Sequence, residues 1–261
     1  MRTPFLEEKT TKRIRSAARI SRAMALCVGV ALFAVSMHPA LAMPYESEQV
    51  TNGGQITGVV KLVGMQPSVP AIKTTKNQDY CGASFPNPLY KVGKSGGLAN
   101  VEVFIKDISK GKPKPTQPIT LTNSHCMFVP RVQGACVGQQ VKNVSDDPIF
   151  HNTHPQIEET GATLYNIALP FKGFSFVHSL PPQAGTLKVK CDAHEWMLAW
   201  ILEFDHPYFT TTDTEGKFDI GDVPPGTYSV VAWHEVMGER TTTVTVSPDK
   251  AATVDFFFTP K

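Results

Sequence analysis

Short segments in which apolar and polar residues alternate recur along most of the chain. Each segment is rich in Val, Ile, Thr and Phe, and Gly or Pro residues separate it from the next. Alternation with a period of two is typical of β-strands, and the chain lacks the longer period of an amphipathic helix. The predicted strands cover residues 54–63, 98–108, 139–144, 174–178 and 198–204. The pattern therefore predicts an all-β protein built of two-layer sandwiches.

One alternating segment leads directly into a cysteine. In Thr186-Leu-Lys-Val-Lys-Cys191, Leu187 and Val189 alternate with lysines and share a strand face with Cys191. We therefore expect this thiol to face the core at the end of a strand.

The segment Cys191-Asp-Ala-His194-Glu-Trp-Met197 brings together a thiol, an imidazole and a thioether. Copper that cycles between Cu(I) and Cu(II) is typically held by two imidazoles and one thiolate, with a weak axial thioether. The segment supplies three of these four donors. His151, which lies earlier in the chain, is the candidate for the missing imidazole.

Residues from about 115 to 205 resemble the cupredoxins, a group that includes amicyanin and plastocyanin. The spacing Cys-x2-His-x2-Met is similar to the short ligand loop of amicyanin-type proteins. The other matching stretches are Phe128-Val-Pro130, Val137-Gly-Gln-Gln-Val-Lys-Asn143 and His151-Asn152.

This resemblance implies a Greek-key sandwich that binds one type 1-like copper ion. Its equatorial ligands would be His151, Cys191 and His194, and its axial ligand would be Met197. Asn152 would tie the two ligand loops together. His194 would be the exposed ligand through which electrons leave, and His151 the buried one. The resemblance extends to periplasmic proteins of the methylamine-utilisation type and implies a redox partner protein.

Other interpretations of the ligand segment remain open. Zinc would use the same Cys and His, but zinc sites usually contain a second close pair of Cys or His and no Met. Glu195 is an alternative oxygen donor, and Met197 could be an ordinary core residue beside a buried thiol. His154 would either assist the metal or be an ordinary loop residue. Trp196 would shield the metal or offer an apolar docking surface.

A second pattern occupies the C-terminal part of the chain. A tight turn at residues 213–216 precedes Phe218 and Ile220, which alternate into a core, and Pro225-Gly226 marks another turn. Over about residues 206–260 this pattern resembles the carboxypeptidase regulatory-like, or transthyretin-like, β-sandwich.

The opening strands of that family resemble residues 54–60 and 99–105, which precede the copper segment. We therefore expect the cupredoxin-like domain to be inserted into the regulatory-like sandwich, because the ends of a compact domain often lie close together. The expected parts are residues 43–111, 112–205 and 206–261. Two tandem sandwiches are the alternative.

The N-terminus has the pattern of a secretory signal peptide over residues 1–42. Seven basic residues precede the apolar run from Ala23 to Val35, and Ala40-Leu-Ala42 fits a cleavage site. The run is shorter than the ~20 residues of a spanning helix, so we expect no membrane span after cleavage. Residues 43–261 contain 18 basic and 21 acidic residues, a charge that does not favour nucleic acid. A periplasmic or secreted bacterial protein is the prediction.

Four cysteines follow the predicted cleavage site. If Cys191 binds copper, one disulfide can form among Cys81, Cys126 and Cys136 in an oxidising compartment. The pair Cys81–Cys126 is preferred because Cys136 fits a strand as a small buried residue, and Cys126–Cys136 is the alternative.

These features predict an exported mononuclear copper protein that carries single electrons. The alternatives are a copper trafficking or storage module and a non-redox adhesion or scaffolding sandwich. An enzyme is not expected, because the chain has neither a second set of copper ligands nor a Gly-x-Ser-x-Gly nucleophile motif.

Overall fold

A computed structural model describes residues 44–260 and shows two β-sandwiches. The predicted signal peptide, residues 1–42, lies outside the described residues. The sandwich that we call the inserted sandwich uses strands β7 to β15, and the host sandwich uses β2, β5 and β16 to β21. No helix within the described part is long and apolar enough to cross a membrane. The predicted all-β class is confirmed.

The inserted sandwich consists of two sheets that face each other across an apolar core. The first has the order β13 (Ser175–Ser179), β10 (Gln140–Ser145), β7 (Ile119–Ser124) and β8 (Met127–Val129). The second has the order β12 (Ile167–Leu169), β11 (His151–Ile157), β14 (Gly185–Lys190), β15 (Leu198–Phe204) and β9 (Val132–Cys136).

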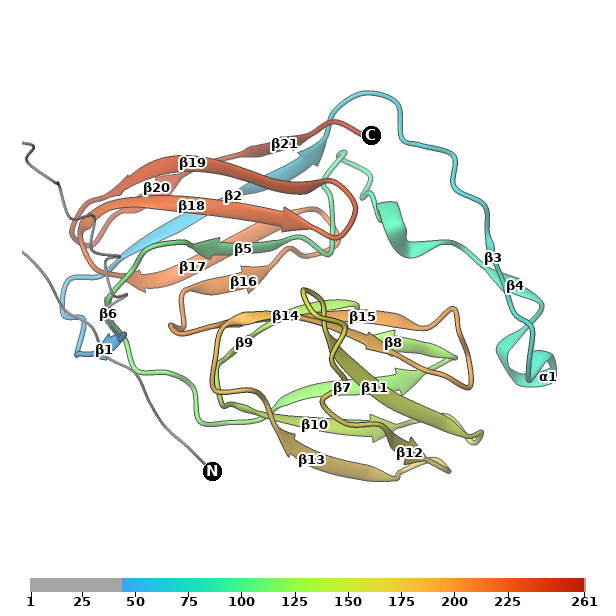
Figure 1. Cartoon of the computed structure of the whole chain (residues 1–261). Coiled ribbons are helices and arrows are strands. Elements are labelled where there is room, and N and C mark those ends of the chain that lie inside the picture. Colours follow the sequence, from blue (N-terminus) through green and yellow to red (C-terminus); the bar gives the residue numbers. More distant parts are fainter. Residues whose placement is uncertain (1–43, 261) are drawn as a thin grey trace, which may run out of the picture. The chain divides into compact units, whose positions relative to one another are not determined.

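The host sandwich combines strands from both sides of the inserted one along the chain. One sheet has the order β16 (Phe209–Thr211), β5 (Glu102–Ile105), β18 (Gly226–His234) and β19 (Gly238–Val246). The other has β17 (Lys217–Val223), β2 (Gly54–Leu62) and β20 (Ala251–Thr253), with β21 (Phe256–Phe258) also paired to β2. Figure 1 shows the blue β2 and the green β5 among the orange and red strands.

This pairing is the insertion arrangement and not the tandem one. The N–H of Val101 donates to Thr212 Oγ1, and the N–H of Thr212 donates to the carbonyl of Val101. The stretch predicted as a strand over residues 98–108 forms only β5, because Asn100 adopts a left-handed φ of 59° and ends the extended backbone. The particular domain boundaries stay predictions.

The two sandwiches share a third apolar core. Val132, Trp200, Leu202 and Phe204 point from the inserted sandwich, and Phe104, Phe209 and Trp233 pack against them from the host. Alternation explains this two-faced use of β15, since Ala199 and Ile201 on its other face belong to the core of the inserted sandwich. Arg131 adds a buried ion pair with Glu235 at 2.5 Å.

Residues 72–85 form a separate element that we call the strap. It consists of β3 (Ile72–Lys73), the helix α1 (Gln78–Cys81) and β4 (Ser84–Phe85), and β3 pairs with β4. A 3-10 turn (Pro88–Tyr90) follows it, and β1 (Glu46–Ser47) pairs with β6 (Lys110–Gly111) elsewhere. The strap was not predicted, because its sequence lacks any apolar period.

Candidate metal centre

His151, Cys191 and His194 come together in the inserted sandwich. His151 begins β11, Cys191 directly follows β14, and His194 lies in the loop before β15. The Nδ1 atoms of both histidines are 3.8 Å from Cys191 Sγ. Ligand atoms of the three residues lie within 4.8 Å of one another, and none of the residues is more than 1% exposed. Three donors therefore converge on one buried point.

The local sequence explains the position of the thiol. Leu187, Val189 and Cys191 are all buried on one strand face, while Lys188 and Lys190 are half-buried on the other. The antiparallel pairing of β11 with β14 then brings the start of β11 beside the end of β14.

Met197 is buried in the same apolar cluster as Cys191. Its N–H donates to the carbonyl of His194 at 2.9 Å, which closes a tight turn in the ligand loop. Its role as an axial ligand stays a prediction.

The outer nitrogen of each imidazole has a hydrogen-bond acceptor. His151 Nε2 lies 2.9 Å from Asp147 Oδ2, and His194 Nε2 lies 2.9 Å from Asn77 Oδ1. Both acceptors require a proton on Nε2, so the Nδ1 lone pairs that face Cys191 are free. Metal-binding histidines commonly have this arrangement.

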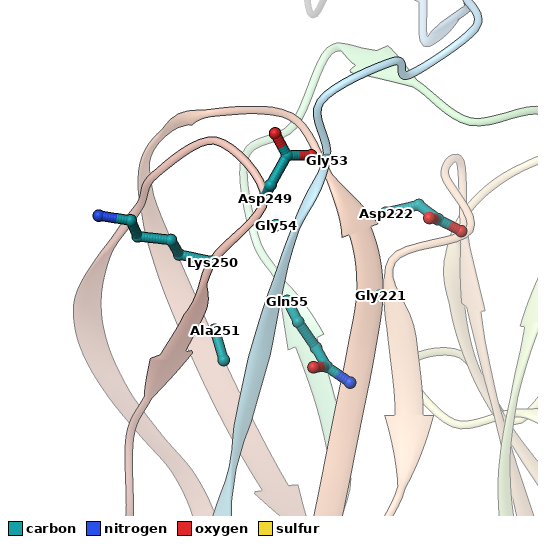
Figure 2. A pocket seen from close by; sticks show the side chains of 8 residues that line it. All are labelled: Gly53, Gly54, Gln55, Gly221, Asp222, Asp249, Lys250 and Ala251. Carbon is teal, nitrogen blue, oxygen red and sulfur yellow. The ribbon is translucent and has the colours of Figure 1, made fainter.

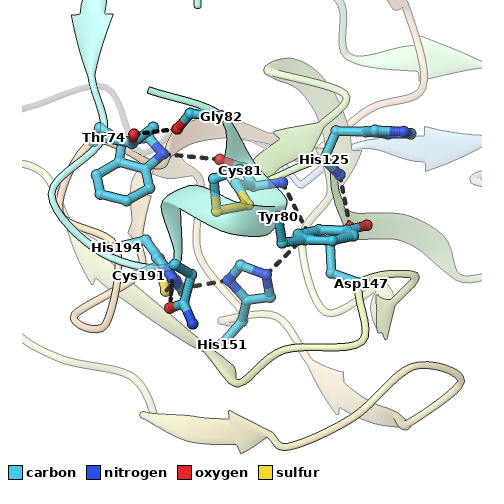
Figure 3. Close-up of a disulfide and its surroundings, with 12 residues drawn as sticks. Thr74, Tyr80, Cys81, Gly82, His125, Asp147, His151, Cys191 and His194 are labelled. Atoms are coloured by element: carbon cyan, nitrogen blue, oxygen red, sulfur yellow. Dashed lines mark hydrogen bonds and ion pairs between the residues drawn. A yellow bond between two sulfur atoms is a disulfide. The ribbon is translucent and has the colours of Figure 1, made fainter. Parts of the chain in front are cut away.

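Asp147 is a buried carboxylate at the centre of a hydrogen-bond network (Figure 3). It accepts the N–H groups of His125 and Cys126 at 2.7 and 2.8 Å and the hydroxyl of Tyr80 at 2.8 Å. Burial raises the pKa of Asp147, but hydrogen bonds from His151 and these groups outweigh it and hold the pKa below its ordinary value. The carboxylate therefore stays ionised and fixes the His151 ring.

The two histidines differ in their proton affinity. Burial lowers the pKa of His151, but the hydrogen bond to Asp147 outweighs it and raises the pKa overall. For His194, burial and then the charge of His151 lower the pKa to about 4. His194 is thus neutral at pH 7, which is the form that binds a metal ion.

Asn152 joins the two ligand loops. Its Oδ1 accepts the N–H groups of Asp192 and Ala193 at 2.7 and 3.2 Å, and its own N–H points to Cys191 Sγ at 3.5 Å. Its Nδ2 donates to Asn166 Oδ1 at 2.7 Å. These hydrogen bonds link the start of β11 to the loop after β14, and the role of Asn152 beside a metal ion stays a prediction.

The expectation that His194 is exposed is wrong. The residue is 1% exposed, because Asn77 of the strap lies over its Nε2 edge. Trp196 is half-buried beside it, with ring centroids 5.1 Å apart, and its Nε1–H donates to the carbonyl of Cys126. Trp196 therefore packs on the ligand loop, and it is not a freely exposed docking surface.

The disulfide of the structure joins Cys81 of the strap to Cys126, the pairing that the sequence analysis preferred. Cys126 lies in the turn between β7 and β8, where His125 and Cys126 both adopt a left-handed φ, as a tight hairpin requires. Cys136 is a free, buried thiol.

Two other histidines, His154 and His234, have contacts outside the donor cluster. His154 contacts Asp192 through Nδ1 at 2.9 Å and Thr163 through Nε2 at 2.8 Å, so both nitrogens have other partners. His234 is 1% exposed and stacks on Tyr90 in the host sandwich.

The donor set fits a trigonal site for a first-row metal. Bonds of about 2.0–2.1 Å to nitrogen and 2.3 Å to sulfur, as zinc makes them, place the two atoms about 3.8 Å apart at an angle of ~120°. The observed S···N distances are 3.8 Å for both histidines. A thiolate, two imidazoles and a nearby thioether match the chemistry of copper better than that of zinc.

Sequence reasoning missed Asp147, Asn77 and Tyr80. Asp147 could have been found, because a carboxylate four residues before a candidate ligand is a common partner of its second nitrogen. Asn77 gave no such signal, since it is 117 residues from His194 along the chain.

A hollow of about 380 Å³ lies in the host sandwich and is separate from this centre. Figure 2 shows its lining, which comes from the ends of β2, β17 and β20 and includes Asp222, Asp249 and Lys250. It contains no His or Cys, so it is unsuited to a soft metal ion.

Comparison with family models identifies one part of the chain. Residues 205–259 match the model described as the carboxypeptidase regulatory-like domain, which confirms the resemblance predicted there. No curated protein matches the chain significantly.

Solved structures of copper proteins are similar to about a third of the chain. A reduced Cu(I) form of an amicyanin mutant has 18% identity and a TM-score of 0.31, and the match covers 34% of this chain and 85% of that one. Amicyanin from Paracoccus versutus has 13% identity and a TM-score of 0.31, with coverages of 34% and 84%. A copper-containing nitrite reductase from Thermus scotoductus has 20% identity and a TM-score of 0.30, with coverages of 37% and 24%.

Proposed function

We propose that this protein is an exported, mononuclear copper protein that carries single electrons. The observation that supports this most directly is the convergence of the His151 and His194 Nδ1 atoms on Cys191 Sγ, both at 3.8 Å, in a buried site. Met197 would be the weak axial ligand. Copper in such a set would supply one-electron cycling between Cu(I) and Cu(II).

Each protein group has a distinct part in this function. Asp147 and Asn77 hold the two imidazoles with Nδ1 facing inward. The N–H of Asn152 donates to the sulfur of Cys191 and so stabilises its thiolate form. Burial of the donors excludes water and keeps their geometry the same in both oxidation states.

The test is copper binding by the chain from Met43, with Cys191→Ser as the variant and Cys136→Ser as the matched control. Cys136 is also a free, buried cysteine, but it lies outside the donor cluster. We expect wild type and Cys136→Ser to bind one copper ion with an intense thiolate-to-copper visible band. Cys191→Ser should lose that band, and an unchanged spectrum in Cys191→Ser would contradict the proposal.

A copper trafficking or storage module is the second candidate. The burial of His194 beneath the strap favours it, because an electron carrier usually exposes one ligand edge to its partner. Reversible one-electron voltammetry would identify the carrier, whereas retention of Cu(I) without reversible current would identify the storage module.

A further inference from the structure

The strap closes the candidate copper site, yet it has no core of its own. No residue of α1 is buried, and Asn77 and Tyr80 are exposed on their outer sides. Asn77 lies at the start of α1 with a left-handed φ of 53°, and its side chain does not cap the helix. The Asn77 side chain forms a hydrogen bond with His194 and does not form the hydrogen bond to the helix backbone that an N-cap residue usually makes.

Three ties connect the strap to the inserted sandwich. Asn77 contacts His194 at 2.9 Å, Tyr80 donates to Asp147 at 2.8 Å, and Cys81 is bonded to Cys126. The first two are single hydrogen bonds on a segment open to water, whereas the third is a covalent bond. An element with few buried apolar contacts opens at low free-energy cost, so the disulfide is the dominant tie.

The sulfur of Cys126 lies close to Asp147 and His151, next to the candidate site. Three buried residues each place one potential ligand atom within 4.8 Å of the others: Cys126, Asp147 and His151. In the disulfide this sulfur cannot act as a thiolate donor. After reduction it would join a carboxylate and an imidazole in a second, three-donor group beside the first.

We infer that the Cys81–Cys126 disulfide locks the strap over the copper site, and that its reduction opens the site and creates a metal-entry site of Cys126, Asp147 and His151. A dithiol reductant supplies the two electrons and two protons. The S–S bond breaks, two cysteine thiols form, and the dithiol becomes a disulfide. This inference rests on the proposed function for the identity of the metal, but the lock itself concerns only this chain.

The lock is tested without metal by the reactivity of His194 toward diethyl pyrocarbonate, which acylates accessible imidazoles. Peptide mapping would compare wild type, its dithiothreitol-reduced form and Cys81→Ser, with His206 as the internal control because it is 3% exposed and outside the site. We expect His194 to react about tenfold faster or more once the disulfide is absent, because the covalent tie then no longer holds the strap over it. No change at His194 would overturn the lock. Equal acceleration at His206 would mean general unfolding and would also overturn it.

The entry site is tested by Cu(I) uptake from its bicinchoninate complex under nitrogen. Cys81→Ser and Cys126→Ser form a matched pair, because each removes the disulfide but only Cys81→Ser keeps the entry thiol. We expect both variants to take up Cu(I) faster than oxidised wild type, with Cys81→Ser the faster of the two. Equal rates in the two variants would overturn the entry site. If neither wild type nor the two variants retain copper, the proposed function fails. The reactivity of His194 still tests whether the disulfide holds the strap closed.

Discussion

Glu102 should make the stability of this protein fall as the pH rises. Its side chain is 0% exposed in the layer between the two sandwiches. Thr211 donates to its Oε2 at 2.5 Å, while its Oε1 has no hydrogen-bond partner among the described residues. Burial raises the pKa of Glu102 from 4.5 to about 8.

The sign of the effect follows from proton binding in the two states. Below pH 4.5 the carboxyl is protonated in both the folded and the unfolded chain, so the stabilisation is complete there. Between pH 4.5 and about 8 only the unfolded chain has lost the proton, and the free energy of unfolding decreases with pH. An interval of roughly 3.5 pH units at 1.36 kcal/mol each gives a loss on the order of 5 kcal/mol.

Glu102→Gln removes this titration and keeps the shape of the side chain. We expect the variant to be more stable than wild type at pH 8 by several kcal/mol, and the difference to shrink toward pH 5. Urea unfolding followed by Trp fluorescence measures it, because Trp200 and Trp233 lie in the same layer. Burial also raises the pKa of Glu203 to about 8. Wild type and Glu102→Gln both contain Glu203, so the difference between their stabilities reports on Glu102 alone. A difference between wild type and variant that is the same at pH 5 and pH 8 would refute the reasoning.

Three further substitutions test other parts of the structure. Asn152→Ala removes the acceptor that joins the ligand loops, and a chelator competition assay should show copper affinity about 10–100-fold weaker. Arg131→Met leaves the buried carboxylate of Glu235 with the Trp200 Nε1–H but without a charged partner, so urea unfolding should show a loss of about 3–5 kcal/mol. A single variant that is more stable than the double variant Arg131→Met with Glu235→Leu would contradict this. Gly134→Ala would place a methyl group against the Phe209 ring and the Glu102 carboxylate, and a thermal melt should show destabilisation of about 1–3 kcal/mol.

The strands and the proximity of Cys191 and His194 follow from local sequence. Alternation placed Cys191 on a buried face, and the short spacing to His194 fixed the second donor in the same loop. The host sandwich was predictable because two separate stretches resemble the carboxypeptidase regulatory-like family. One is the turn pattern after residue 212, and the other is the pair of strands before residue 106. These features depend on neighbouring residues and on patterns of fixed length.

The environment of the donors depends on contacts between distant residues. His194 is buried beneath Asn77 and beside Trp196, and His234 is buried against Tyr90. The contacts with Asn77 and Tyr90 have no periodic signal, since each joins a loop to a residue far along the chain. The sequence favoured Cys81–Cys126 and left Cys126–Cys136 as an alternative pairing. It could not decide between these two disulfides, because the distance between the cysteines depends on the path of the strap.

The interrupted host sandwich constrains the order in which this chain folds. β2 pairs with β17 and, in parallel, with residues 251–253 and 256–258, all of which lie beyond the inserted sandwich along the chain. Closing so long a loop in an unfolded chain is slow, because the chain loses conformational entropy before the contacts between its ends can form and stabilise it. Once the inserted sandwich has folded, its two ends are already near each other, as the Val101–Thr212 hydrogen bonds indicate. We therefore expect the inserted sandwich to fold first and the host sandwich to close around it last.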